Sequence, residues 1–184
     1  MAWFYASAHL LARRRGDGFS LAAPVRPEDL LPLLRLAKGR RCVAELGTGT
    51  AWTAVALALA DRHRQVVSYD PVYHPQRGWY LRRAGAQARE RIDLRSEPGE
   101  AGPGDDDPPV EFLFIDIGGH GREETAAAFR AWRGSLAPGA VVVFHDYGSR
   151  FVGVAEAVAE LGLRGHVTGE SLFVWRAPQP SKEE

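Results

Sequence analysis

The feature that most constrains the fold is a glycine turn between a strand-like segment and an Ala/Leu-rich segment. Residues 41–46 form a short run typical of a strand, Gly47-Thr48-Gly49 follows, and residues 52–60 have the composition of a buried helix. A strand that turns into a helix needs glycines where the backbone bends sharply and where a ligand approaches it closely. The glycine turn (residues 47–49) therefore predicts an α/β fold with a ligand site.

Strand-like and helix-like segments alternate along the rest of the chain, which predicts a mostly parallel sheet with helices on both faces. The expected strands cover residues 41–46, 65–69, 92–96, 110–115, 140–144, 166–168 and 171–175, and the expected helices cover residues 27–36, 52–60, 79–91, 123–136 and 151–161. The last two strands are separated by a two-residue link, which permits a hairpin but no crossover helix, so we expect them to be antiparallel. Residues 97–109 are rich in Gly, Pro and Asp and predict an exposed, mobile loop.

Length and composition indicate one domain of the soluble, globular kind. The 184 residues are 45% hydrophobic, which is enough for one substantial core. We expect a helical preamble at residues 1–40, the domain at 41–177 and a disordered tail at 178–184. Lys+Arg and Asp+Glu are each 23, so no global positive field favours a large nucleic-acid substrate. The single Cys42 cannot form an internal disulfide, and it suits a cytoplasmic location.

The N-terminal segment is apolar from Met1 to Leu11, and a basic run at residues 13–15 follows it. A secretory signal has its basic residues before the apolar part, and a bilayer-spanning helix is longer. Trp3, Phe4 and Tyr5 would otherwise form an exposed apolar patch. We therefore expect a covering helix or a homodimer contact, and no membrane association.

Three features near the glycine turn distinguish among nucleotide-containing ligands. Asp70 ends the next expected strand, where a carboxylate can accept hydrogen bonds from ribose hydroxyls; the alternative is that Asp70 only opens a turn before Pro71. A dinucleotide fold expects a third glycine where Trp52 stands. Glu45 suits a cationic ligand and would repel phosphates. A nicotinamide-dependent oxidoreductase is therefore the weaker alternative.

Four motifs, each at the end of an expected strand, carry a family resemblance. They are Val43 to Gly49, Tyr69-Asp70, Phe114-Ile115-Asp116 with His120, and Pro138 to Tyr147. Together they resemble the class I S-adenosylmethionine-dependent methyltransferases and, more narrowly, the small-molecule O-methyltransferases of methyltransferase family 24. The resemblance implies a Rossmann-like, seven-stranded, mostly parallel sheet with an antiparallel final strand. It also implies an enzyme that methylates a small hydroxylated metabolite.

The same resemblance implies roles for individual residues around S-adenosylmethionine. It places Glu45, Gly47 and Gly49, with Thr48 in the same turn, around the methionine, Asp70 on the ribose, and Ser96 or Glu97 near the adenine. Relatives commonly read Phe-Ile-Asp-Gly-Asp-His, whereas this chain has one extra residue before His120 and lacks the second Asp.

Polar side chains follow two expected buried strands and define the reacting face (Asp116, His145 and Asp146). Ligands of open α/β sheets gather beyond the carboxyl ends of the strands. Related catechol-type enzymes hold a divalent ion there, so Asp116, His145 and Asp146 are the predicted ligands of Mg²⁺ or another divalent metal. The alternative is that Asp116 contacts the cofactor while His145-Asp146 forms a hydrogen-bonded strand end.

The acceptor's proton needs a base, and His120 and His145 are the two predicted catalytic residues. Because a fold does not fix a function, a non-catalytic cofactor-binding or interaction protein remains the second hypothesis. The sequence leaves open the substrate, the use of a metal, the choice between the two bases and the oligomeric state.

Overall fold

The computed structural model describes residues 2–148 and 150–179 and contains a seven-stranded sheet in the order β3-β2-β1-β4-β5-β7-β6. The strands are β1 (Cys42–Leu46), β2 (Gln65–Tyr69), β3 (Ile92–Arg95), β4 (Val110–Ile115), β5 (Leu136–Phe144), β6 (His166–Thr168) and β7 (Leu172–Arg176). The pairs from β3 to β5 are parallel, and β7 runs antiparallel to both β5 and β6. The predicted Rossmann-like sheet and its antiparallel final strand are confirmed.

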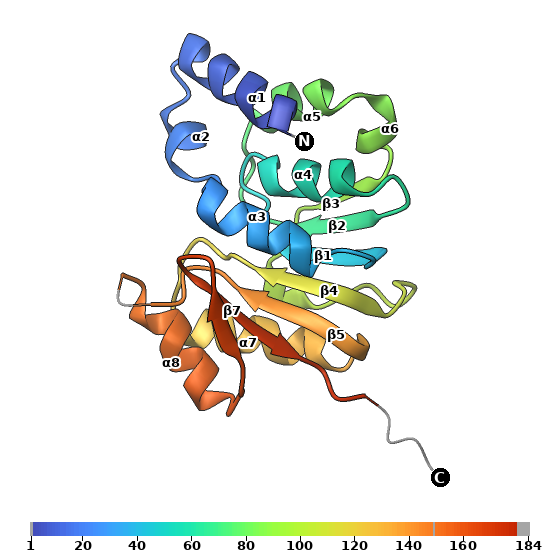
Figure 1. Cartoon of the computed structure of the whole chain (residues 1–184), viewed down its shortest axis with the longest axis vertical. Helices are drawn as coiled ribbons and strands as arrows, with labels where there is room; N and C mark the ends of the chain where they lie inside the picture. The colour runs from blue at the N-terminus through green and yellow to red at the C-terminus, as the bar shows by residue number, and fades with distance from the viewer. Residues whose placement is uncertain (1, 149, 180–184) are drawn as a thin grey trace.

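Helices cover both faces of this sheet (Figure 1). They are α1 (Ala2–Arg15), α2 (Gly18–Ala22), α3 (Pro27–Leu36), α4 (Trp52–Ala60), α5 (Arg77–Ala84), α6 (Ala86–Arg89), α7 (Arg122–Arg133) and α8 (Val152–Glu160), with a 3-10 turn η1 (Gly99–Ala101). The helices α4, α5 and α6 lie on one face with α1 above them, and α7 and α8 lie on the other. The single helix expected at residues 79–91 is divided at Gly85, whose φ of +83° interrupts it.

The central strands are buried on both faces, because their successive side chains point to opposite sides of the sheet. Val43, Phe114 and Val143 pack in the cluster that includes α3 and α4, whereas their neighbours in each strand pack toward α7 and α8. Glu45, Asp116 and His145 each come two positions after one of these three residues, so their side chains point to the same face of the sheet. The functional side chains at the strand ends therefore lie on the side of the sheet that α3 and α4 cover.

Helix α1 adds a third layer over α4 and α5. Phe4 and Ala8 are fully buried against Trp52 and Tyr80, so the expected covering helix is present, although Trp3 on the same helix is 66% exposed. In the part of the chain that the structure describes, no helix is long and apolar enough to cross a membrane.

The expectation of an exposed, mobile loop at residues 97–109 is wrong in part. Gly99 is buried and its carbonyl accepts a hydrogen bond of 2.7 Å from the Trp132 indole, while Arg95 binds Asp107 at 2.6 Å. These contacts tie both ends of the segment to the core, and neither follows from local composition. The predicted tail falls mostly on residues 180–184, which lie outside the described residues.

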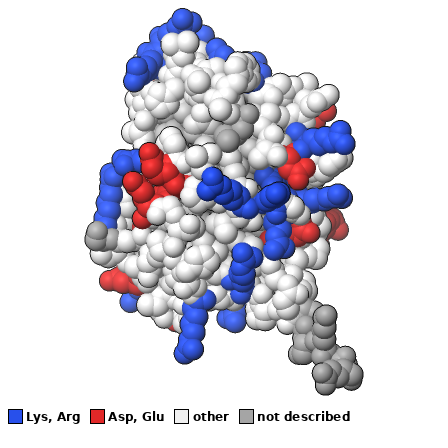
Figure 2. All heavy atoms as spheres, viewed as in Figure 1, with Lys and Arg blue, Asp and Glu red and all other residues white. Residues whose placement is uncertain are grey.

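Charged side chains of both signs are spread over the face in view. Figure 2 shows Lys and Arg side chains at the top, along the left edge and across the centre and right, with an acidic patch on the left. The carboxyl ends of the parallel strands lie on that left side (Figure 1). The acidic patch and the carboxyl ends of these strands therefore lie on the same side of the molecule.

Candidate functional site

The glycine turn is shaped first by contacts within the chain. Gly47 has a φ of +107°, and a Cβ built on it would lie 1.9 Å from the backbone oxygen of Asp116. Its amide donates to the Tyr69 carbonyl at 2.8 Å. Only glycine allows β1, β2 and β4 to meet so closely at this edge. The glycine was predicted to allow the approach of a ligand, and the contact with the Asp116 backbone supplies a second reason for glycine at this position.

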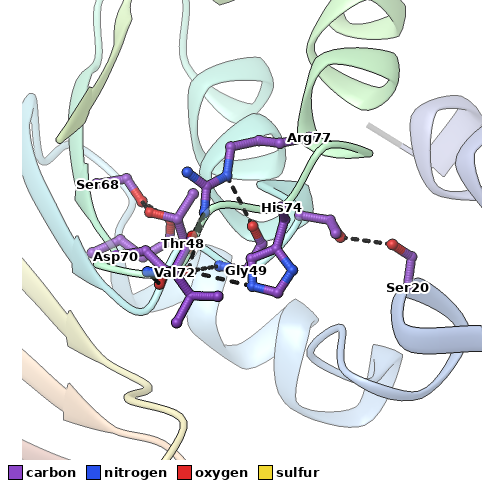
Figure 3. Close-up of polar contacts among 10 residues, drawn as sticks. Ser20, Thr48, Gly49, Ser68, Asp70, Val72, His74 and Arg77 are labelled. Atoms are coloured by element: carbon purple, nitrogen blue, oxygen red, sulfur yellow. Dashed lines mark hydrogen bonds and ion pairs between the residues drawn. The ribbon is translucent and has the colours of Figure 1, made fainter. Parts of the chain in front are cut away.

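Asp70 lies at the end of β2 and fastens the glycine turn (Figure 3). Its carboxylate accepts hydrogen bonds from the Gly49 amide at 2.7 Å and the Val72 amide at 2.8 Å. The Arg77 guanidinium donates to the same carboxylate at 3.1 Å and to the Gly49 carbonyl at 2.9 Å. Asp70 therefore opens the turn before Val72, which was one of the two predictions for this residue. Its carboxylate also faces the glycine turn, as the predicted ribose contact requires.

Arg77 was missed by sequence reasoning, and its neighbour His74 was left without a role. His74 stacks on Phe19 of α2 with ring centroids 4.6 Å apart, and Ser20 of α2 donates to the Thr50 hydroxyl at 3.0 Å. A short N-terminal helix therefore lies against the glycine turn. The local sequence around Phe19 gives no signal of this contact.

Glu45 is completely buried at the end of β1. Ser68 donates to its Oε2, and Thr48 and Ser68 share a hydrogen bond of 2.6 Å (Figure 3). Among the described residues its Oε1 has no hydrogen-bond partner. Burial raises the pKa of Glu45 to about 8, with a smaller contribution from the Asp116 charge. A buried carboxyl group with one free oxygen is poised for a ligand that brings a donor or a positive charge.

Ser96 and Glu97, the two residues expected near the adenine, follow β3 and are both exposed. The backbone carbonyl of the preceding residue, Arg95, accepts a hydrogen bond of 3.0 Å from the Asp70 amide. The pair therefore lies beside the end of β2, on the edge that the resemblance implies.

The reacting face is built around His145. Its Nδ1 lies 2.8 Å from Asp116 and 3.4 Å from Asp146, and its Nε2 lies 3.6 Å from Asp29 of α3. Burial by itself lowers the pKa of this imidazole, but the carboxylates outweigh burial and raise it to about 10. At neutral pH the imidazole therefore stays protonated, which disfavours His145 as a base.

A different histidine completes the cluster. One ligand atom each from Asp116, His120 and Asp146 lies within 4.8 Å of the others. His120 and Asp146 have φ values of +47° and +57°, which are rare for residues with a side chain. Strained backbone of this kind concentrates at functional sites. The geometry thus brings His120 to the two carboxylates, which His145 also contacts as predicted from the sequence.

Asp29 lies in the first turn of α3 and was not among the site residues predicted from the sequence. In the structure this residue is 4% exposed. Its carboxylate accepts hydrogen bonds from the Glu170 amide at 2.6 Å and from the Ser171 hydroxyl at 2.8 Å. Burial favours its neutral form, but these hydrogen bonds and His145 lower its pKa to about 2. Gly169 makes room for this carboxylate, since a Cβ there would lie 2.2 Å from Asp29. Asp29 thus joins α3, the β6–β7 turn and the reacting face.

The strand order, the glycine turn and the polar strand ends together define a Rossmann-like methyltransferase fold. A family of methyltransferase domains, Methyltransf_24, matches residues 44–147, which is more than half of the chain. The chain belongs to this family and is an S-adenosylmethionine-dependent methyltransferase, as its motifs predict.

Solved structures share the fold at low sequence identity. Cofactor-bound Rv0187 from MTB is 20% identical in sequence, and its structure superposes with a TM-score of 0.70. The match covers 94% of this chain and 87% of Rv0187. The O-methyltransferase TomG from Streptomyces achromogenes, solved with its cofactor, is 17% identical over 96% of this chain and 89% of its own, with a TM-score of 0.69. An O-methyltransferase from Bacillus cereus, in complex with the demethylated cofactor, has 17% identity, coverages of 84% and 81%, and a TM-score of 0.61. No curated protein matches the sequence.

Proposed function

We propose that the protein transfers a methyl group from S-adenosylmethionine to a hydroxyl group of a small metabolite, with a divalent metal at Asp116, His120 and Asp146. The observation that carries the proposal is this cluster, which lies at the ends of β4 and β5 beside the glycine turn. The similar structures include O-methyltransferases by their own descriptions, which supports a hydroxyl acceptor.

The residues around the glycine turn fit the cofactor. Glu45 offers its free Oε1 to the ammonium group of the methionine, and Asp70 lies where ribose hydroxyls can share its carboxylate. We keep Ser96 and Glu97 as the proposed adenine neighbours. Trp52, fully packed at the start of α4, occupies the position where a dinucleotide site needs glycine. S-adenosylmethionine supplies an electrophilic methyl group on a positively charged sulfur.

The donor set of the cluster fits a divalent cation. Two carboxylates suit a hard ion such as Mg²⁺, and the imidazole also admits a transition metal. Such an ion would orient the acceptor hydroxyl and lower its pKa. His145 lies behind this site and, as a cation, holds Asp116 in place through the 2.8 Å contact. His120 has one nitrogen 3.5 Å from Asp146, which leaves its other nitrogen for the ion or for the acceptor's proton.

The test is transfer of tritiated methyl from S-adenosylmethionine to a panel of small phenols and alcohols, with Mg²⁺ or with a chelator. Transfer that the chelator abolishes supports the metal-dependent reaction. Transfer that survives chelation and is lost in His120→Ala instead assigns the proton to that histidine. No transfer to any acceptor, together with cofactor binding, favours the alternative of a non-catalytic cofactor-binding protein.

We further propose that exposed apolar side chains on α1 form a homodimer contact. Trp3 is 66% exposed and Leu10 is 50% exposed, although Phe4 on the same helix is buried within the chain. Sedimentation should show a dimer that Trp3→Ser weakens. A monomer at all concentrations would contradict this proposal.

A further inference from the structure

The N-terminus of α4 is buried, and no side chain caps it. The residue before the helix, Ala51, has a φ of +70° and no side-chain hydrogen bond, and the first turn contains no acidic residue. Ala51, Trp52 and Ala54 are buried. The first amides of a helix have no partners within it, and a buried helix end without a cap therefore implies another acceptor. The partial positive charge at this end favours an anion.

A second, independent observation points to the same place. The hydroxyl oxygen of Tyr5, on α1, is buried and has no hydrogen-bond partner among the described residues. Its ring is held edge-on to Trp52, the first residue of α4, with centroids 5.5 Å apart. The Thr53 hydroxyl, in the first turn of α4, lies close enough to donate toward the Tyr5 oxygen and lower the pKa of Tyr5, but this contact gives the phenol proton no acceptor. A buried phenol without a partner is costly unless a ligand accepts its proton.

The charges around Tyr5 determine what that ligand can be. Burial is the main cause that raises the pKa of Tyr5, and Glu45 and Asp116 raise it further. The phenol therefore stays protonated and acts as a donor. Glu45, whose free Oε1 is the proposed partner of the ammonium group, is neutralised by that pairing and does not repel the adjacent carboxylate. The only anionic group of S-adenosylmethionine is the carboxylate of its methionine, next to the ammonium group assigned to Glu45.

We propose that Tyr5 donates a hydrogen bond to the methionine carboxylate of the cofactor, which sits at the uncapped N-terminus of α4. The proposal rests on the cofactor site proposed above. Tyr5 lies outside residues 44–147, so the family match does not assign it. The N-terminal helix is then part of the cofactor site, and a chain without α1 loses affinity for S-adenosylmethionine.

The experiment compares Tyr5→Phe with the wild type in calorimetric titrations of three probes. S-adenosylmethionine has the carboxylate, decarboxylated S-adenosylmethionine keeps the ammonium group alone, and 5′-methylthioadenosine has neither. Loss of a hydrogen bond to a charged group should weaken S-adenosylmethionine about tenfold in Tyr5→Phe. The affinities of the other two probes should stay unchanged.

Thermal unfolding without ligand provides the structural control. Tyr5→Phe removes a hydroxyl that has no partner, so the melting temperature should not fall. The matched variant is Tyr80→Phe, because Tyr80 packs on the same Trp52 ring but donates to Asp17 at 2.7 Å. It should lower the melting temperature and leave the preference among the three probes unchanged.

Equal weakening of all three probes by Tyr5→Phe, unchanged binding of S-adenosylmethionine, or a fall in melting temperature like that of Tyr80→Phe would each overturn the proposal. Failure of the wild type to bind any of the three probes would instead refute the cofactor site itself.

Discussion

The cofactor half and the reacting half of the site differ in how they are assembled. The cofactor half, residues 45–77, is one strand-turn-helix-strand unit and the start of the next helix. The reacting half joins Asp29, Asp116 and His145, and the Asp29 contact to Ser171 spans 142 residues of sequence. A local unit can be recognised from spacing and residue type. A constellation from distant segments depends on packing that only the folded chain reveals.

The comparison predicts that the two halves affect different measurements. The largest effect is expected in the reacting half, where Asp116→Asn and His120→Ala should each lower turnover by about 100-fold or more. Affinity for the demethylated cofactor should change little in His120→Ala. Asp106→Asn, an exposed carboxylate in the loop before β4, is the control and should keep full activity. Full turnover in both site variants would remove the cluster from the mechanism.

The cofactor half should respond in binding. Asp70→Ala should weaken binding of S-adenosylmethionine by about 1.5 to 3 kcal/mol, through lost ribose contacts and a loosened turn at Gly49. Calorimetry measures the change, with Asp93→Asn, a largely exposed carboxylate on β3, as the control. Wild-type affinity in Asp70→Ala would show that this carboxylate does not contact the cofactor.

Glu45 makes the binding depend on pH. Because its pKa is about 8 without ligand, the carboxyl group must lose a proton to pair with the cofactor's ammonium group. Affinity should therefore rise between pH 6 and 8, by at most about tenfold per pH unit. Glu45→Gln should flatten this dependence. A steep rise that persists in the variant would assign the proton to another group.

The last expected effect concerns stability in the reacting half and leaves binding and turnover aside. The pKa of His145 is about 10 in the folded protein, against an ordinary value of 6.5, so its stabilising contribution is complete below pH 6.5 and lost as the pH rises through 10. Denaturant unfolding should show the wild type losing on the order of 1 to 3 kcal/mol over this range relative to His145→Gln. Parallel profiles for the two proteins would mean that His145 is neutral in the fold.

The sequence alone predicted most of the fold and the cofactor half. Alternation of strands and helices indicated the sheet, and the two-residue link at Gly169-Glu170 indicated the final hairpin. The order of the motifs identified the family. These features are local, so their physical cause lies within a few residues.

The remainder depended on contacts between distant residues. The different roles proposed for His120 and His145 follow from the carboxylates that surround each ring. Asp29 reaches His145 only because α3 packs against the end of β5. Tyr5 and the uncapped end of α4 meet because α1 folds over Trp52. The segment before β4 is ordered by Trp132, which follows it in the chain.

The most direct test of the central claim is calorimetric titration of the wild type with the demethylated cofactor S-adenosylhomocysteine and, separately, with NADH. The free Oε1 of Glu45, the Asp70 carboxylate and the buried Trp52 all favour the first ligand. The account predicts saturable binding of S-adenosylhomocysteine at one site per chain and no binding of NADH. Heat from NADH with none from S-adenosylhomocysteine would contradict it.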